Sequence, residues 1–339
     1  MNRKERKSQN GSGRYLMFLI VLITVLIAAV PFRMIRRYQK ENSQKKISVI
    51  FISKRLDEEN DFWSSMLEGT NMAAAEYNIE LTAMGPKSES EIERQNEMIE
   101  EAIKMKPDAI VLVPSDVEQT ISYARKIEAA GIELVLMDSV MEEEAGSCVV
   151  STDNYEGGRK MGEYLKDHIG QSAVIGIVAH SPTSSTAIDR ERGVRAGLDE
   201  YEEQIREVVY CYADEQKAYD VTSELLMRNP DMNMIAGLNE DSAVGAAKAI
   251  RDAGRSEQIT LIGFDSSIEQ VYLLEEGVFN AIVIQKPLNM GYLGIQAAYH
   301  TVTGTAVDDT IDSGSVLITK ETIYTRENEK LLFPFRQSD

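Results

Sequence analysis

The sequence has few of the side chains that hold metal ions or build disulfide frameworks. Its 339 residues include two cysteines, Cys148 and Cys211, and only three histidines. The two cysteines lie far apart and do not form a metal-type pair. So few sulfur and imidazole ligands leave little material for a zinc site. The sequence therefore predicts no metal and no cofactor.

The sequence motifs of common enzymes are also missing. The glycines of NYEGGRKMG (154–162) do not have the spacing of a GxGxxG or GxxxxGK[ST] phosphate loop. Neither a GxSxG nucleophile elbow nor an HExxH zinc helix is present. His180 and the serines of AHSPTSST suggest a hydrolase, but no acid stands at a recognisable spacing from them. We therefore do not expect an enzyme.

Positive charge is scarce in most of the chain. Residues 1–46 hold eleven of the 36 lysines and arginines but only two of the 55 acidic residues. The remainder therefore carries a formal charge of -28, whereas the whole chain carries -19. Such an acidic body repels phosphate backbones, so nucleic-acid binding is not expected.

One long uncharged run, YLMFLIVLITVLIAAVPF (15–32), stands near the start of the chain. Its length is sufficient for a membrane span. Its cleavage pattern is poor, Pro31 follows directly, and basic residues resume at Arg33, which favours a retained anchor over a cleaved signal peptide. Basic residues flank both sides, so charge alone does not orient the span. We predict a basic segment at 1–14, a transmembrane signal-anchor at 15–32 and a linker at 33–46.

From Ile47 onward, short apolar runs alternate with amphipathic segments. Several runs are apolar without interruption, as required for burial on both faces of a parallel sheet. The amphipathic segment 88–106 opens with Ser88 and Glu91 at the spacing of a capping box. This alternation predicts an α/β fold with two doubly wound parallel sheets. The predicted strands are 47–52, 79–84, 109–113, 132–137, 148–152, 173–178, 207–212, 234–238, 259–264 and 280–285.

Polar and aromatic residues follow the carboxyl ends of these predicted strands, where open α/β sheets bind ligands. Carboxylates, amides and a guanidinium suit a polyhydroxyl ligand, and flat aromatic rings suit the C–H face of a sugar. The alternative is that Phe62 and Trp63 only cover the sheet edge, and that Asn239 and Asp265 only cap helices. The residues concerned are Asn60, Phe62, Trp63, Asp138, Arg190, Asp214, Glu215, Asn239, Asp265 and Gln285.

Seven longer stretches of the body form a recognisable series. The stretches are NDFWSSMLEG (60–69), LMDS (136–139), STDNYEGGRKMGEYL (151–165), AIDRERGVRAG (187–197), GLNEDSAVGAAKAI (237–250), IGFDSS (262–267) and IQKPLNMG (284–291). Taken together, they make residues 47–325 resemble a type I periplasmic sugar-binding protein of the ribose- and galactose-binding group, whose fold also forms the core of the lactose repressor. They occur in the family's order and at its spacing.

The resemblance implies two lobes joined by three hinge crossings, with the ligand between them. The lobes would be 47–152 plus 286–312 and 153–285 plus 313–325, followed by a tail at 326–339. Phe62 and Trp63 would stack on the sugar ring. The hydrogen-bonding residues implied by the resemblance are Asn60, Asp138, Arg190, Asn239, Asp265 and Gln285.

Three departures from the family put the identity of the sugar in doubt. Ser139 stands where ribose-binding relatives have an arginine, Glu215 where they have an aromatic, and Val113 where galactose-type relatives tend to have an asparagine. Ser139 and Glu215 are therefore included among the candidate ligand-binding residues. The extra carboxylate suggests a ligand with cationic character, such as an amino sugar. The alternative is that Glu215 faces solvent or pairs with Arg190 or Lys217.

The resemblance and the membrane anchor together predict a function. A repressor would have a basic DNA-binding segment where this chain has its apolar run, so the sugar-binding body is expected on the extracytoplasmic side, with 1–14 in the cytoplasm. We predict a membrane-anchored solute-binding protein that presents a sugar to an ABC permease. One alternative is a ligand-sensing partner for a sensor kinase or chemoreceptor. Another is a carbohydrate-active enzyme with two paired carboxylates.

Overall fold

The computed structural model describes residues 17, 46–56, 60–141 and 145–332. The chain divides into two units, Met1–Lys46 and Ile47–Asp339. The predicted signal-anchor and its flanking segments lie outside the described residues, apart from Met17 and Lys46. No helix among the described residues has the length and apolar character needed to cross a membrane.

The first sheet belongs to one lobe of the second unit and consists of six parallel strands. Its order is β2–β1–β3–β4–β5–β11. Apolar clusters cover both of its faces, so the uninterrupted apolar runs are buried as a parallel sheet requires. The strands are β1 (Ser48–Ile52), β2 (Glu80–Met84), β3 (Ala109–Leu112), β4 (Glu133–Met137), β5 (Cys148–Ser151) and β11 (Thr310–Asp312).

The second sheet forms the other lobe in the order β7–β6–β8–β9–β10–β12. Five strands are parallel, and β12 runs antiparallel to β10. The chain leaves β10 at the end that faces the first lobe and, after passing through that lobe, enters β12 at the same end. The strand β12 therefore runs in the opposite direction to β10. The strands are β6 (Ile175–Ala179), β7 (Ile205–Tyr210), β8 (Met234–Gly237), β9 (Thr260–Phe264), β10 (Ala281–Ile284) and β12 (Val316–Thr319).

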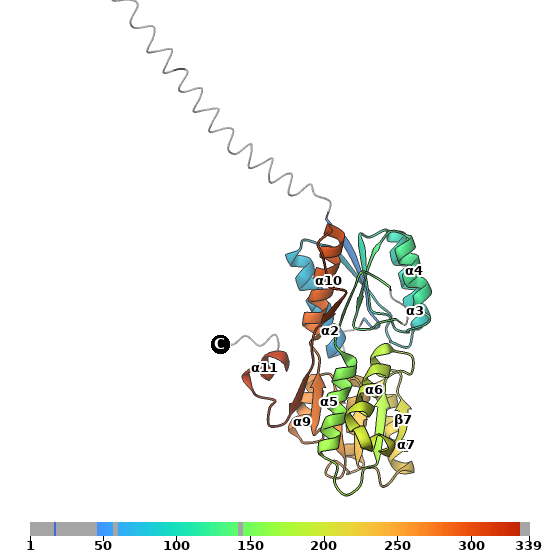
Figure 1. Ribbon diagram of the computed structural model, residues 1–339, viewed down its shortest axis with the longest axis vertical. Coiled ribbons are helices and arrows are strands. Elements are labelled where there is room, and N and C mark those ends of the chain that lie inside the picture. The colour runs from blue at the N-terminus through green and yellow to red at the C-terminus, as the bar shows by residue number, and fades with distance from the viewer. Residues whose placement is uncertain (1–16, 18–45, 57–59, 142–144, 333–339) are drawn as a thin grey trace, which may run out of the picture. The chain divides into compact units, whose positions relative to one another are not determined.

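Helices cover the faces of both sheets (Figure 1). The first lobe contains α2 (Asp61–Glu76), α3 (Ile92–Met105), α4 (Ile121–Ala129) and α10 (Pro287–Thr303). The second contains α5 (Asn154–Asp167), α6 (Ser185–Leu198), a 3-10 helix (Asp199–Gln204), α7 (Glu215–Arg228), α8 (Glu240–Asp252), α9 (Ile268–Glu275) and α11 (Arg326–Leu332). The predicted α/β class with two parallel-sheet lobes is confirmed.

The chain passes between the two lobes three times. It leaves the first lobe between β5 and α5, returns between β10 and α10, and leaves again between β11 and β12. Thr152 and Ser313, on two of these connections, are hydrogen-bonded through their hydroxyl groups at 3.0 Å. A Cβ atom on Gly314 would stand 3.3 Å from Lys286 Nζ on the remaining connection. The three connections therefore lie side by side.

Two sequence interpretations need correction. The helix predicted at 88–106 begins only at Ile92, and Glu91 caps it without a side-chain hydrogen bond. Ser88 does not form the predicted capping box, because its hydroxyl contacts Ser90 and thereby builds a local turn. The strands β11 and β12 were not predicted, because they have only three and four residues.

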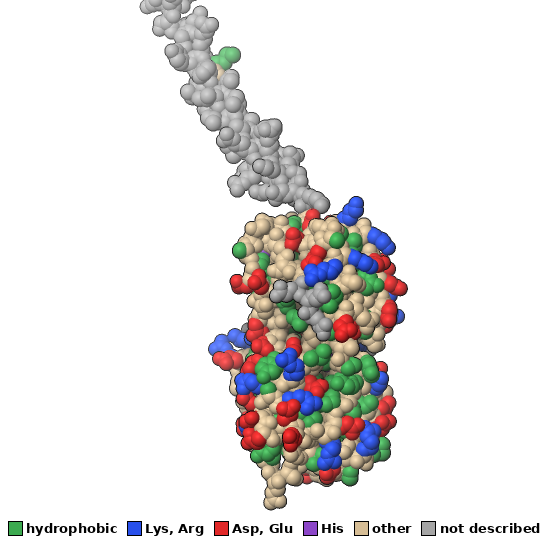
Figure 2. All heavy atoms as spheres, turned by 45° about the vertical axis from the view of Figure 1, so that its right-hand side comes forward, with side chains coloured by type: hydrophobic (Ala, Val, Ile, Leu, Met, Phe, Trp, Pro, Cys, Tyr) green, Lys and Arg blue, Asp and Glu red, His purple; other side chains and the backbone are tan. Residues whose placement is uncertain are grey.

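The surface of the lobes carries both signs of charge. On the face shown in Figure 2, acidic and basic side chains of the described residues are interspersed. This face has no continuous basic strip of the kind that binds phosphate backbones.

Glycines allow α5 and α6 to approach each other closely, side by side in the second lobe (Figure 1). A Cβ atom on Gly158 would stand 2.1 Å from the carbonyl oxygen of Arg190, and one on Gly193 would stand 2.1 Å from that of Tyr155. Because glycine has no side chain at these positions, α6 can lie close to α5, and this contact fixes the position of the Arg190 backbone.

We expect Gly158→Ala to lower the free energy of unfolding by about 1–3 kcal/mol, because the new methyl group forces α5 and α6 apart. Urea denaturation measures the change. Gly170→Ala is the matched control, since a Cβ there meets nothing within 4 Å. Equal stability of the two variants would contradict close backbone packing at Gly158.

Candidate ligand-binding site

The carboxyl ends of the strands in both lobes face one small cavity of about 20 Å³. Eight of the eleven candidate residues named from the sequence line this cavity, whereas Ser139, Asp214 and Glu215 do not. Lys54, Glu89, His180, Thr186 and Glu240 line it as well and were not predicted. The full lining is Lys54, Asn60, Phe62, Trp63, Glu89, Asp138, His180, Thr186, Arg190, Asn239, Glu240, Asp265 and Gln285.

Two aromatic rings from the first turn of α2 form one wall. The Asn60 side chain caps this helix by accepting a hydrogen bond from the Trp63 amide at 3.1 Å. The rings of Phe62 and Trp63 lie edge to face, with their centres 4.9 Å apart. Both are buried and also pack on the core of the first lobe. They therefore cover the sheet and face the cavity at the same time, so the two interpretations of the sequence are compatible.

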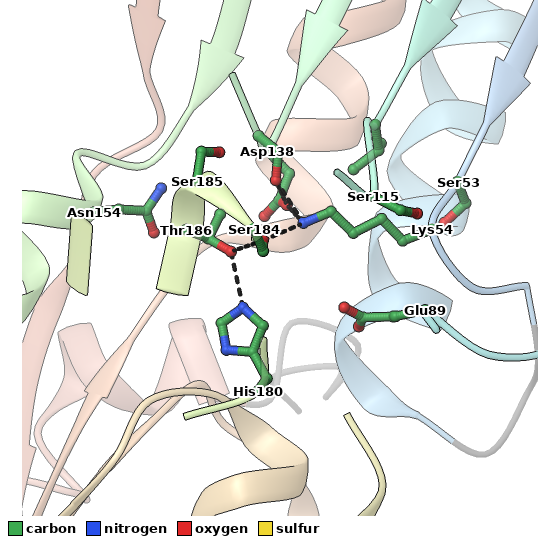
Figure 3. Close-up of polar contacts among 12 residues, drawn as sticks. Ser53, Lys54, Glu89, Ser115, Asp138, Asn154, His180, Ser184, Ser185 and Thr186 are labelled. Atoms are coloured by element: carbon green, nitrogen blue, oxygen red, sulfur yellow. Dashed lines mark hydrogen bonds and ion pairs between the residues drawn. The ribbon is translucent and has the colours of Figure 1, made fainter. Parts of the chain in front are cut away.

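Lys54 stands two residues after β1 and brings a buried ammonium group into the site (Figure 3). Its Nζ donates to Asp138 Oδ2 at 2.9 Å and to Ser139 Oγ at 2.5 Å. Only 2% of Lys54 is exposed. The sequence analysis missed it because a lysine after a strand is usually at the surface. Its position two residues after the apolar run 49–52 was the available signal.

The second lobe provides a second buried cation, Arg190 on α6. Its guanidinium donates to Asn154 Oδ1 at 2.8 Å and to the Leu238 carbonyl at 2.7 Å. It also lies over the ring of Phe264, 3.8 Å from the ring centre. Burial lowers the pKa of Arg190, and the nearby Asp265 and Asp138 oppose that shift. These contacts fix the plane of the guanidinium at the cavity wall.

A row of hydroxyl and imidazole groups lies on the second-lobe side of Lys54 (Figure 3). Ser184 Oγ is 3.5 Å from Lys54 Nζ and 2.9 Å from Thr186 Oγ1. Thr186 Oγ1 is in turn 3.0 Å from His180 Nε2. Burial lowers the pKa of His180 well below its usual value, and Arg190 adds to this effect. The imidazole is therefore neutral near pH 7.

Two aspartates occupy equivalent turns in the two lobes. Asp138 follows β4 with φ of 63°, and Asp265 follows β9 with φ of 75°. Each backbone amide donates to the neighbouring strand, at Val150 and Val283, over 2.8 Å. Positive φ is uncommon for residues other than glycine and is often found at functional sites. The turns direct both carboxylates to the cavity.

The two remaining predicted amides have different partners: Gln285 holds Asp265 in place, and Asn239 caps a helix. Asp265 accepts hydrogen bonds from Gln285 Nε2 at 2.6 Å and from the Glu240 amide at 2.9 Å. Asn239 caps α8 by accepting from the Ser242 amide at 3.0 Å. Asn239 is therefore a helix cap and a cavity residue together.

Ser139 and Glu215 are placed differently from the other predicted residues. Ser139 lies behind the wall, where its hydroxyl contacts Asp138 and Lys54. Glu215 is the first residue of α7 and lines a neighbouring pocket. Its carboxylate is 2.5 Å from Lys248 Nζ. The suggested ion pairs of Glu215 with Arg190 and Lys217 are therefore wrong, and Lys248 takes their place.

Direct contacts join the two lobes around the cavity. The Phe62 amide donates to Glu240 Oε2 at 3.3 Å, and Arg55 Nη1 lies 3.4 Å from Asp241 Oδ1. The Ile268 amide donates to Asp61 Oδ2 at 3.0 Å. Carboxylates thus supply the acceptors for these three bonds between the lobes.

The acids at these contacts hold protons more strongly than usual. Burial raises the pKa of Asp241 to about 7, with repulsion from Glu89 adding to the shift and Arg55 opposing it. Burial, followed by repulsion from Asp265, raises the pKa of Glu240 well above its usual value. Burial likewise raises the pKa values of Glu89 and Asp265.

Among the residues that the structure describes, no group of three or more His, Cys, Asp or Glu side chains is placed to hold a metal ion. Cys148 and Cys211 are buried, free thiols. The groups that face the cavity are hydrogen-bond donors, acceptors and aromatic rings.

The raised pKa of Asp241 predicts a pH dependence of stability. The folded protein takes up this proton near pH 7, whereas the unfolded chain does so near pH 3.8. The free energy of unfolding should therefore rise as pH falls from about 8 to about 5. In Asp241→Asn this rise should be smaller by about 2–4 kcal/mol. Urea denaturation at several pH values tests this, and parallel profiles for the two proteins would contradict it.

Known proteins with a similar chain are sugar-binding and sugar-transport proteins. A sugar transporter from Clostridium phytofermentans is 42% identical, with a TM-score of 0.77, and the match covers 81% of this chain and 100% of that one. An ABC transporter solute-binding protein from Agrobacterium vitis, solved with bound D-fucose, is 26% identical, with a TM-score of 0.79 and coverage of 84% and 99%. The D-ribose/D-allose-binding protein of Pseudomonas aeruginosa is 26% identical over 84% of this chain and 91% of that protein.

The family model for the periplasmic binding protein domain matches residues 49–306. The match includes both sheets except for β11 and β12, and it includes every residue that lines the cavity. The chain therefore belongs to the periplasmic binding protein family, and its relatives bind sugars.

Proposed function

We propose that this protein captures a sugar between its two lobes outside the cytoplasmic membrane and presents it to an ABC permease. In this proposal, residues 15–32 tether the body to the membrane. The observation that carries the proposal is the cavity itself. Buried acids, amides and cations from both lobes line it, together with two aromatic rings from the first lobe.

Each wall of the cavity offers a different part of what a sugar needs. Asp138 and Asp265 accept hydrogen bonds from hydroxyl groups, and Lys54 and Arg190 donate to ring or hydroxyl oxygens. Hydrogen bonds to charged groups contribute about 1.5–3 kcal/mol each, more than neutral ones. Trp63 and Phe62 provide apolar surface for the C–H face of the ring. Both lobes contribute, so the complete set of contacts requires the lobes to be together.

The size of the cavity implies movement during binding. A volume of about 20 Å³ is close to what one water molecule needs, roughly 10–15 Å³. A sugar ring is several times larger. The lobes must therefore separate, or Lys54 must leave Asp138, before a sugar can enter. The three chain crossings provide a hinge for such opening.

The first binding prediction concerns Asp265. Asp265→Asn keeps the shape of the side chain and removes its charge, so sugar binding should weaken about 10–100-fold. Calorimetry with D-ribose, D-allose, D-arabinose and D-fucose measures the change on the full-length protein. Asp231→Asn is the matched control, because Asp231 is an exposed residue that pairs with Arg206. Unchanged affinity in Asp265→Asn would remove this carboxylate from the site.

The second binding prediction concerns lobe closure. Met105 in the first lobe and Met227 in the second are exposed, so cysteines at these positions accept fluorescent labels, whereas Cys148 and Cys211 are buried. Addition of a bound sugar should shift the distribution of label distances toward one closed state. Asp265→Asn should need about 10–100-fold more sugar for the same shift. A distribution that does not respond to saturating sugar would contradict closure.

A further inference from the structure

Two adjacent carboxylates at the start of α8, Glu240 and Asp241, are more than nine-tenths buried but poorly partnered. Glu240 is 9% exposed and Asp241 8%. The Glu240 side chain accepts one long hydrogen bond, from the Phe62 amide at 3.3 Å. Asp241 Oδ1 meets Arg55 at 3.4 Å, while Oδ2 has no hydrogen-bond partner among the described residues. Buried carboxylates in such surroundings are costly unless a donor or cation reaches them.

The charges around this pair are predominantly negative. Asp61 on α2, Asp265 after β9, Glu89 before α3 and Glu215 on α7 all repel Glu240 or Asp241. Four of the nearby cations are engaged, whereas Lys87, which lines an adjoining pocket, is exposed. Lys54 pairs with Asp138, Arg190 donates to Asn154 and Leu238, Arg55 pairs with Asp241, and Lys248 pairs with Glu215 and Glu269. Within the described ranges, no lysine or arginine lies within 4.0 Å of Glu240. A positive charge next to Glu240 and Asp241 would lower the electrostatic cost of burying them.

The shape of the cleft gives that charge a route in. Glu240 and Asn60 line both the cavity and an adjoining pocket of about 500 Å³. Asp241, Asp214 and Glu215 lie on the second-lobe side of this pocket, and Arg55, Lys87 and Ser88 lie on the first-lobe side. The cavity and the pocket therefore meet at Asn60 and Glu240, which leaves a path from one to the other past the Glu240 carboxylate.

We propose that the ligand is a sugar that carries a positively charged amine, and that Glu240 and Asp241 accept the hydrogen bonds of its ammonium group. This inference rests on the proposed function, since it names the class of sugar for the same site. An ammonium has three donors and no acceptor, which matches two carboxylates that lack donors. A neutral hydroxyl offers one donor and no positive charge to favour the ionised forms of the two acids.

Calorimetry on the full-length protein tests the inference with three matched pairs of sugars. D-Glucosamine, D-galactosamine and D-mannosamine differ from D-glucose, D-galactose and D-mannose by one amine in place of one hydroxyl. We expect at least one amino sugar to bind ten times more tightly than its neutral parent, or better. In Glu240→Gln this preference should fall to less than threefold, because the variant keeps the shape and loses the charge. Glu257→Gln, at an exposed position, should keep the full preference.

The outcomes separate the inference from the proposed function. If neutral hexoses bind and no amino sugar binds more tightly than its parent, the inference is wrong and the proposed function stands. If the preference for the amine survives in Glu240→Gln, the assignment to this carboxylate is overturned. If neither these sugars nor D-ribose, D-allose, D-arabinose and D-fucose bind, the proposed function fails and the inference fails with it. A thermal unfolding measurement is the folding control, and Glu240→Gln should unfold at the same midpoint temperature as the parent protein.

Discussion

The direction of the strands is the constraint on which this site depends. In a parallel sheet all strands end at the same edge, so the residues that follow them collect in one place. Lys54, Asp138, His180, Asn239, Asp265 and Gln285 each stand at or near such an end, on β1, β4, β6, β8, β9 and β10. Because the hinge joins the two sheets at these edges, the two sets of residues face each other. The direction of the strands therefore determines which residues lie together at the site.

Burial then determines how the charges of the site behave. Each lobe contributes one deeply buried cation, Lys54 from the first and Arg190 from the second. Each cation is held by its own hydrogen bonds, to Asp138 in one lobe and to Asn154 and Leu238 in the other. The low effective dielectric of a closed cleft strengthens these interactions, and it equally raises the cost of acids that lack a partner. In the proposed function, closure of the lobes would therefore strengthen binding and would also make the site selective for the charge of the ligand.

The sequence predicted the strands and most of the cavity lining, because both follow from local patterns. Ten apolar runs correspond to observed strands, and acids directly after strands, such as Asp138 and Asp265, reach the cavity. The contacts that the sequence did not predict join residues that lie far apart in the chain. Glu215 pairs with Lys248, 33 residues away, and no local sequence pattern predicts that contact. Lys54 was missed because its burial depends on Asp138 and Ser139, which lie 84 and 85 residues further along the chain.

The two lobes also share a connectivity. Apart from the last strand of each, the orders β2–β1–β3–β4–β5 and β7–β6–β8–β9–β10 have the same pattern. Asp138 and Asp265 occupy the same left-handed turn after the fourth strand of each. The repeated strand order therefore brings one aspartate to the corresponding turn of each lobe. The cations do not repeat in this way, because Lys54 stands after the strand β1 in the first lobe and Arg190 stands on the helix α6 in the second. The two walls of the cavity are thus alike in their acids and unlike in their bases.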